Sequence, residues 1–141
     1  MSWLTYAILA ASGFGFYNFF VKISADKFSP TVAGIFIALS SFVVAVIATL
    51  YFKMSGQNLV FTKSSLVLLI LAGIFTALGE FFFLFMYAKG SPITIGNPVV
   101  VGGTVLVSMI LGVIVLKEPM NITKVAGTIF VLIGLVLLAR S

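Results

Sequence analysis

The sequence predicts an all-α membrane protein with five transmembrane helices. Of its 141 residues, 62% are hydrophobic and only 8% are charged. A soluble domain has about 25% charged residues, because its surface faces water. Apolar segments close to the ~20 residues needed to cross the ~30 Å hydrocarbon layer divide the chain. The expected helices span residues 3–21, 31–52, 65–88, 92–116 and 122–139.

The first three segments have recognisable starts. Residues 3–21 follow no basic leader and no evident cleavage site, so we expect a permanent helix and not a signal peptide. Ser29 and Pro30 precede the second segment, where serine can cap free amides and proline has no N–H to lose. Ser64 could cap the third segment in the same way.

The last two segments are bounded by similar signals. Ser91-Pro92 is a second Ser-Pro start, for the fourth segment, and Lys117-Glu118-Pro119 ends it. The longest loop, residues 53–63, joins the second and third segments. Glu118 falls at the membrane edge beside two lysines, so we expect a local ion pair or a helix-end charge there.

Composition excludes several chemistries. The chain has no Cys and no His, so it can form neither a disulfide nor a Cys/His metal site. It also has no Walker loop and no set of residues for a nucleophilic triad, so we expect no enzyme, no cofactor and no metal. The chain has 8 basic and 3 acidic residues, and the basic residues lie at the ends of apolar segments, which indicates anchoring in a lipid bilayer and not nucleic-acid binding.

Basic residues are divided equally between the two sides of the membrane. With five spans, Lys53, Lys63, Lys117 and Lys124 fall on one side, and Lys22, Lys27, Lys89 and Arg140 on the other. The positive-inside rule requires an excess on one side, and here there is none. Either a weak bias, such as the N-terminal amine, still selects one orientation, or the chain inserts both ways and pairs with an inverted copy. We favour dual topology, because inverted repeats are a common architecture of transporters.

The order of several motifs resembles a known family. FGFYNFFVK (14–22) provides an aromatic-Gly…Lys opening, and a small-residue turn at 88–91 precedes the helix that contains Pro98. LKE follows at 116–118, and then a helix with Gly127 and Gly134. Together these features resemble an EamA domain of the drug/metabolite transporter superfamily, over essentially the whole chain. One departure is the segment 34–44, which lacks the Arg that many EamA domains carry in the second helix.

The resemblance implies a function and an assembly. Many members carry two such domains in inverted orientation, so a single five-helix unit implies an antiparallel homodimer of ten helices. It also implies a secondary transporter, an exporter or exchanger of a small organic metabolite or cation, in the inner membrane of a prokaryotic cell. Two other functions stay open: a passive channel or facilitator, and a non-transporting subunit that assembles with a different membrane protein.

Glu80 is an acid inside an otherwise apolar segment. An acid near the bilayer centre costs roughly 2.5–3.5 kcal/mol for Asp on insertion scales, so it should face the bundle interior or a wet cavity. Gly73, Thr76 and Tyr87 share its helical face. We expect Glu80 to couple protons or contact substrate. Two alternative roles for Glu80 are to fix helix packing, as a protonated or hydrogen-bonded acid, or to form an ion pair with Lys22 or Lys89.

Other helices offer polar and small residues. Tyr17, Asn18, Thr76, Tyr87 and Asn97 are the predicted cavity-lining residues, where an aromatic wall and an acid would suit an organic cation. Pro98 removes a backbone donor, and with Gly102 and Gly103 it predicts a hinge. Strips of small residues predict close helix contacts or dimerisation, namely Gly34, Ala38, Ser41 and Ala45, Ser108 and Gly112, and Gly127 and Gly134.

Overall fold

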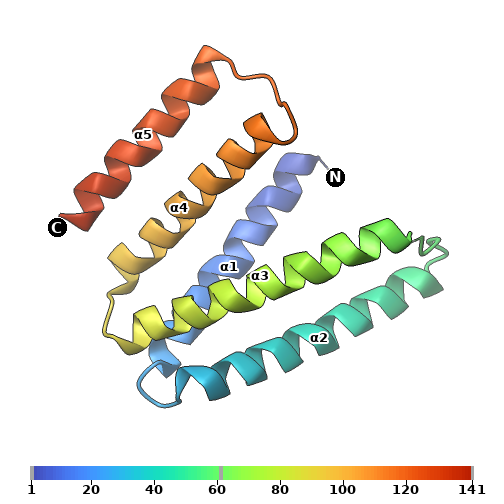
Figure 1. Ribbon diagram of the computed structural model, residues 1–141. Helices are drawn as coiled ribbons and strands as arrows, with labels where there is room; N and C mark the ends of the chain where they lie inside the picture. The colour runs from blue at the N-terminus through green and yellow to red at the C-terminus, as the bar shows by residue number, and fades with distance from the viewer. Residues whose placement is uncertain (1, 61, 141) are drawn as a thin grey trace. The chain divides into compact units, whose positions relative to one another are not determined.

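The computed structural model describes residues 2–60 and 62–140, which form helices and loops and contain no β-strand (Figure 1). The helices are α1 (Trp3–Ser24), α2 (Pro30–Met54), α3 (Lys63–Ala88), α4 (Ile93–Ile114) and α5 (Ile122–Ala139). The predicted all-α fold class is confirmed. α1 to α4 are long and apolar enough to cross a membrane, and α5 is a shorter apolar helix.

Three helix starts differ from those predicted. Ser29 is the N-cap residue of α2 and Pro30 is its first residue, but the Ser29 side chain makes no capping hydrogen bond. α3 begins at Lys63, because the Oγ1 of Thr62 accepts a hydrogen bond from the Ser65 amide at 3.2 Å, so the capping residue is Thr62 and not Ser64. At the start of α4 the N-cap position is Pro92, and no side chain caps the helix. α5 has a true side-chain cap, in which Asn121 Oδ1 accepts from the Lys124 amide at 2.9 Å.

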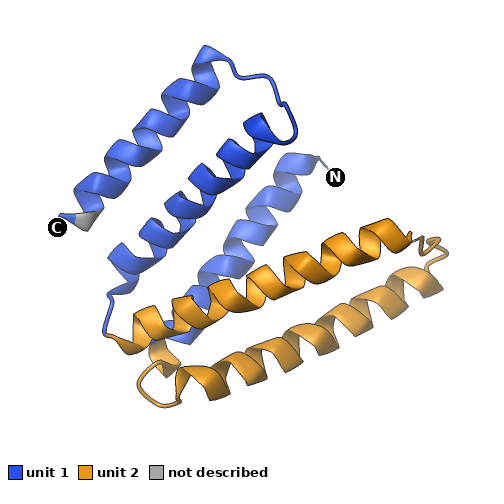
Figure 2. Cartoon of the chain, viewed as in Figure 1, with its two compact units in different colours: residues 1–22, 90–141 blue, residues 23–89 orange. Residues whose placement is uncertain are grey.

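The chain divides into two compact units (Figure 2). Residues 1–22 and 90–141 form the first unit, which contains most of α1 together with α4 and α5. Residues 23–89 form the second, the antiparallel pair of α2 and α3. Each unit has its own point of close helix packing.

In the first unit, α4 and α5 lie side by side (Figure 1). The two helices meet at Gly102. Gly102 is buried, and a Cβ at this position would overlap the side chain of Leu135, whose Cγ lies 2.7 Å away. Further along, the Thr128 hydroxyl donates to the sulfur of Met109 at 2.9 Å. The absence of a side chain at Gly102 thus lets Leu135 of α5 rest on the α4 backbone.

In the second unit, α2 meets α3 near the start of α2. A Cβ on Gly34 would lie 3.4 Å from Cε1 of Phe81 and 3.5 Å from Cδ1 of Leu84. No residue of α2 is buried, and the buried residues of α3 are Phe83, Leu84 and Tyr87, all near its end. The contact between the two helices is therefore closest at the end away from the loop that joins them.

The glycines in the predicted small-residue strips of α4 and α5 have different surroundings. A Cβ on Gly127 or Gly134 would meet nothing within 4 Å, so these glycines make no close helix contact in this chain. Gly112 is buried, and a Cβ there would lie 3.5 Å from the carboxylate of Glu118, not against another helix. Among the glycines of these strips in the described residues, Gly34 on α2 is the one that makes a close interhelical contact, and a role of the strips in dimerisation stays a prediction.

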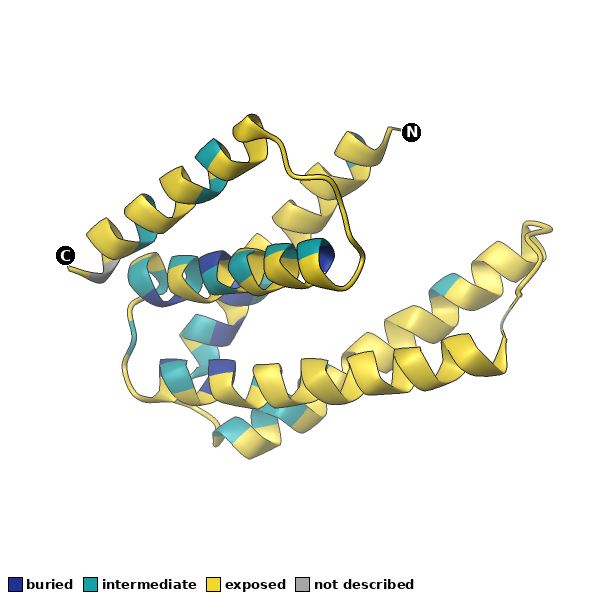
Figure 3. Cartoon of the chain, turned by 45° about the horizontal axis from the view of Figure 1, so that its top comes forward, coloured by how far each residue is buried: buried dark blue, intermediate teal, exposed yellow. Residues whose placement is uncertain are grey.

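Almost all large apolar side chains are exposed, on every helix (Figure 3). Among the described residues, the buried hydrophobic side chains are Val21, Phe83, Leu84 and Tyr87. A monomeric soluble protein rarely exposes an apolar patch of more than a few hundred Å². The exposed surface of these helices therefore requires lipid or protein around it.

Candidate functional site

The residues predicted to form the site are distributed over both units. Tyr17, Asn18, Asn97, Pro98, Gly102 and Gly103 belong to the first unit, and Thr76, Glu80 and Tyr87 to the second. Each group is described within its own unit.

A pair of side-chain amides, with Asn18 buried and Asn97 half-buried, joins α1 to α4 in the first unit. Asn18 is only 7% exposed, and its Nδ2 donates to Oδ1 of Asn97 at 2.8 Å. The sequence predicted both residues to be cavity-lining without placing them together, and the structure brings them into direct contact. Because this hydrogen bond uses one donor and one acceptor, the Asn18 oxygen and the Asn97 nitrogen are the groups of the pair that a polar ligand could engage.

Pro98 lies next to this pair, inside the continuous helix α4. Proline has no N–H, so it cannot donate to the carbonyl of Thr94, and one backbone acceptor is freed one turn before the proline. The preceding Gly96 is buried, and Tyr17 on α1 is half-buried. This part of the unit thus combines a side-chain amide pair with a backbone carbonyl that has lost its helical donor.

The two glycines predicted to act with Pro98 differ in their surroundings. The side chain of Leu135 occupies the space where a Cβ on Gly102 would lie, whereas a Cβ on Gly103 would meet nothing within 4 Å. Gly102 therefore provides a packing contact between α4 and α5. A hinge at these residues stays a prediction.

Glu80 lies at a boundary along α3 in the second unit. It is half-buried, and the buried residues of α3 begin at Phe83, less than one turn further on. Tyr87 is fully buried, and its ring stands edge-on to the ring of Phe83, with centroids 4.9 Å apart. On the other side of Glu80, Thr76 is exposed, and its hydroxyl donates to the Ala72 carbonyl of its own helix at 2.8 Å.

Two buried neighbours of Glu80 were not identified from the sequence. Phe83 and Leu84 follow Glu80 by three and four residues, and both are buried. The same helical spacing that selected Thr76 and Tyr87 also selects these positions. They were missed because an apolar side chain in a Phe-rich membrane helix gives no sign of whether it faces lipid or protein.

Of the two alternatives predicted for Glu118, the local ion pair is not formed in the described residues, and the helix-end charge stays a prediction. The Glu118 side chain folds back over Gly112, with Oε2 3.5 Å from the position of a Cβ there, and its amide donates to the Gly112 carbonyl at 3.0 Å. The Lys124 ammonium instead donates to the carbonyl of Pro119 at 2.9 Å. The turn at Lys117, with φ of 53°, directs Glu118 toward α4 and away from an ion pair with Lys124.

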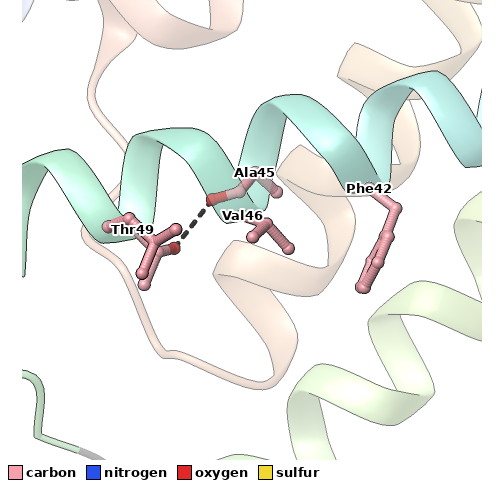
Figure 4. Close-up of a pocket in the computed structure, with 5 residues that line it drawn as sticks. Phe42, Ala45, Val46 and Thr49 are labelled. Atoms are coloured by element: carbon pink, nitrogen blue, oxygen red, sulfur yellow. Dashed lines mark hydrogen bonds between the residues drawn. The ribbon is translucent and has the colours of Figure 1, made fainter.

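A shallow depression on α2 is apolar and open. It has a volume of about 320 Å³ and is lined by Phe42, Ala45, Val46, Thr49 and Leu50, all from one helix (Figure 4). The Thr49 hydroxyl donates to the Ala45 carbonyl at 2.8 Å, so it offers no free donor. With no charged residue and no second element in its wall, this depression is part of the apolar surface and not a ligand site.

Comparison with known proteins identifies the family. The family model described as the EamA-like transporter family matches residues 1–140. No curated protein and no solved structure matches the chain. Proteins of this family are membrane transporters of the drug/metabolite type, and the apolar helices agree with an integral multi-pass membrane protein. The chain therefore belongs to the EamA-like transporter family.

Proposed function

We propose that this chain is a secondary transporter of a small organic metabolite or cation, an exporter or exchanger that binds a proton or its substrate at Glu80. We further propose that it works by alternating access as an antiparallel dimer in the inner membrane of a prokaryotic cell. Family membership supports membrane transport. Export or exchange and the prokaryotic inner membrane are what the family resemblance implies, and the roles of Glu80 and of the dimer are argued from the residues.

The position of Glu80 is the observation that carries the proposal. The chain has three acids, and Asp26 and Glu118 lie in loops, so Glu80 is the only acid inside a helix. Glu80 lies eight positions before Ala88 at the end of α3, which is about 12 Å along the helix axis. Placing an acid at this depth in the bilayer costs free energy, and such residues in membrane helices usually mark ion or substrate pathways.

The surroundings of Glu80 favour a cationic or proton-exchanging partner. A single carboxylate can bind one proton or one organic cation, so binding of one releases the other. The aromatic residues Phe83 and Tyr87 follow on the same helix, and aromatic faces attract cations. An exchanger that carries a substrate cation against protons needs no further acidic group.

Charge balance supports the antiparallel dimer. Four basic residues fall on each side of the membrane, so neither orientation is favoured by the positive-inside rule. The extensive apolar surface leaves room for a second copy within the bilayer. Two inverted copies would form the pseudo-symmetric halves on which alternating access depends.

Proton release from vesicles tests the role of Glu80. Purified protein is reconstituted into liposomes that contain a pH-sensitive dye, and a panel of organic cations that includes ethidium and methyl viologen is added outside. We expect at least one cation to move protons out of the vesicles with wild type and none to do so with Glu80→Gln. Glu118→Gln is the matched control, because it removes an acid outside the helices.

Two outcomes would contradict the proposal. Cation-driven proton movement that is equal in wild type and Glu80→Gln would show that this carboxylate is not the coupling group. Cation uptake without any proton movement, unchanged by the substitution, would instead favour a passive facilitator.

A further inference from the structure

The loop between α2 and α3 forms a polar depression at the end of the helix pair. It has a volume of about 420 Å³ and is lined by Lys53, Gly56, Gln57, Asn58 and Leu59. We call these five residues the loop pocket. It is separate from the residues assigned to transport, since none of them lines it.

The backbone of the loop pocket is held by the C-terminal cap of α2. The Gly56 amide donates to the Lys53 carbonyl at 3.1 Å, and the Gln57 amide donates to the Phe52 carbonyl at 3.1 Å. Together with the φ of 83° at Gly56, these two bonds form a Schellman motif. The motif places Lys53 in the last turn of the helix beside the two amide side chains that follow.

The polar side chains of the loop pocket are available to a ligand. In the described part of the chain, the Lys53 ammonium and the side-chain amides of Gln57 and Asn58 make no hydrogen bond with the protein. Together they offer several N–H donors and one positive charge. The segment 53–63 contains two lysines and no acid, so its charge favours an anion.

Apolar side chains next to the loop pocket indicate where this anion lies. Met54 is 88% exposed, Val60 is 85% exposed, and Leu59 in the pocket wall is 54% exposed. α2 and α3 are long and apolar enough to cross a membrane, which puts the loop that joins their ends at the boundary between lipid and water. A ligand at this level that is anionic at one end and apolar at the other satisfies both kinds of side chain.

We propose that the loop pocket binds the phosphate of an anionic phospholipid headgroup. Lys53 would contact the phosphate oxygens, the amides of Gln57 and Asn58 would donate to the phosphate or the headgroup, and Met54, Leu59 and Val60 would lie against the upper acyl chains. A free phosphate could contact Lys53 and the two side-chain amides, but it has no apolar part to cover Met54, Leu59 and Val60. The lipid is therefore the ligand that accounts for all of them.

The bound headgroup would stabilise the loop end of the second unit. α2 and α3 are in close contact near Gly34, at the end away from the loop. A lipid phosphate held by Lys53 and by the loop amides would join the end of α2 to the segment that leads into α3. Anionic lipid in the leaflet that contains this loop is thus expected to stabilise the pair of helices.

Local fluorescence quenching tests the proposal. A Val60→Trp reporter is introduced beside the loop pocket in a Trp3→Phe background, since Trp3 is the chain's single tryptophan. The protein is reconstituted with brominated phosphatidylglycerol or brominated phosphatidylcholine at equal mole fraction. We expect the anionic lipid to quench more strongly, and Lys53→Gln to weaken its apparent affinity about fivefold.

Lys89→Gln is the matched control, because it removes one positive charge from a different loop and Lys89 does not line the loop pocket. We expect it to retain the preference for phosphatidylglycerol. If Lys53→Gln does not fold, a Gln57→Ala/Asn58→Ala variant, which leaves every charge in place, should weaken the preference.

Three results would overturn the proposal. Equal quenching by the two lipids would exclude selective binding at this loop. An equal loss of preference in Lys53→Gln and Lys89→Gln would assign the effect to general surface charge. Competition by millimolar inorganic phosphate as effective as that by unlabelled phosphatidylglycerol would identify a free-anion site in place of a lipid site.

Discussion

Two adjacent glycines of α4 have opposite surroundings. Gly102→Ala should force the new methyl group into Leu135 and lower the stability by about 1–3 kcal/mol, the usual effect of overpacking. Gly103→Ala should be neutral or stabilising by up to about 1 kcal/mol, because alanine favours the helix and its Cβ meets nothing within 4 Å. Thermal unfolding in detergent micelles measures both.

The double variant Gly102→Ala/Leu135→Ala separates overpacking from a change in helix flexibility. If the destabilisation arises from the overlap with Leu135, removing that side chain should relieve part of it. Equal destabilisation by Gly102→Ala and Gly103→Ala would contradict the packing role of Gly102.

The amide pair makes a second prediction for single residues. Asn97→Ala leaves the buried Asn18 amide without its hydrogen-bond partner and should destabilise the protein by about 1–2 kcal/mol. Replacing both asparagines by leucine should cost less than the single change, because no polar group then remains unsatisfied. Unfolding by a denaturing detergent gives the comparison.

Thr104→Ala is a suitable control for the amide pair. Among the described residues, its exposed hydroxyl donates to the Val100 carbonyl of its own helix, at 2.9 Å, and to no other helix. A loss of stability as large as that of Asn97→Ala would mean that the bond between α1 and α4 contributes nothing specific.

At the level of the helix, the end of α2 depends on one glycine. Gly56 has a φ of 83°, which an L side chain adopts only with strain. Gly56→Ala should therefore destabilise the α2 end by about 1–2 kcal/mol. Hydrogen exchange of the Gln57 amide, which bonds to Phe52, should become faster, whereas amides in the middle of α2 should be unaffected. Unchanged exchange at Gln57 would contradict this account of the cap.

Helix type was predictable from the sequence, and exact helix ends were less so. Long apolar segments indicated helices, because a spanning segment must satisfy its backbone internally. The ends depended on which nearby polar residue caps the chain. At α3 the capping residue is Thr62 and not Ser64, and α4 starts at Ile93 without a side-chain cap. Several candidates within one turn are equivalent in sequence, and only the backbone geometry distinguishes them.

For the whole molecule, dual topology makes a labelling prediction. The chain has no cysteine, so Phe28→Cys and Met120→Cys place single thiols in loops that alternate topology puts on opposite sides of the membrane. With a membrane-impermeant maleimide, each should be labelled partially in intact cells and completely in opened membranes. Complete labelling of one thiol and none of the other in intact cells would show a single orientation.

Charge substitution provides the control for that experiment. Lys117→Gln with Lys124→Gln leaves two basic residues on one side and four on the other. By the positive-inside rule, the side with four should then become cytoplasmic. In intact cells the thiol from Met120→Cys should become fully labelled, and the thiol from Phe28→Cys should become protected. Labelling that does not respond to this change would mean that loop charge does not set the orientation.

The sequence by itself determined that the chain lies in a lipid bilayer, that its fold is all-α, and that one acid, Glu80, lies inside an apolar helix. These properties follow from composition and from the length of apolar segments, which depend little on how the helices pack. Its motifs also carried the resemblance to the family that residues 1–140 match.

The tertiary structure decided which residues meet. It joined Asn18 to Asn97, seated Leu135 on Gly102 and folded Glu118 over Gly112. A membrane helix is apolar on its lipid-facing and protein-facing sides alike, so periodicity cannot separate them. The rotation of each helix toward its neighbour therefore depends on side-chain shape and on a few hydrogen bonds, which become apparent only when the helices lie together.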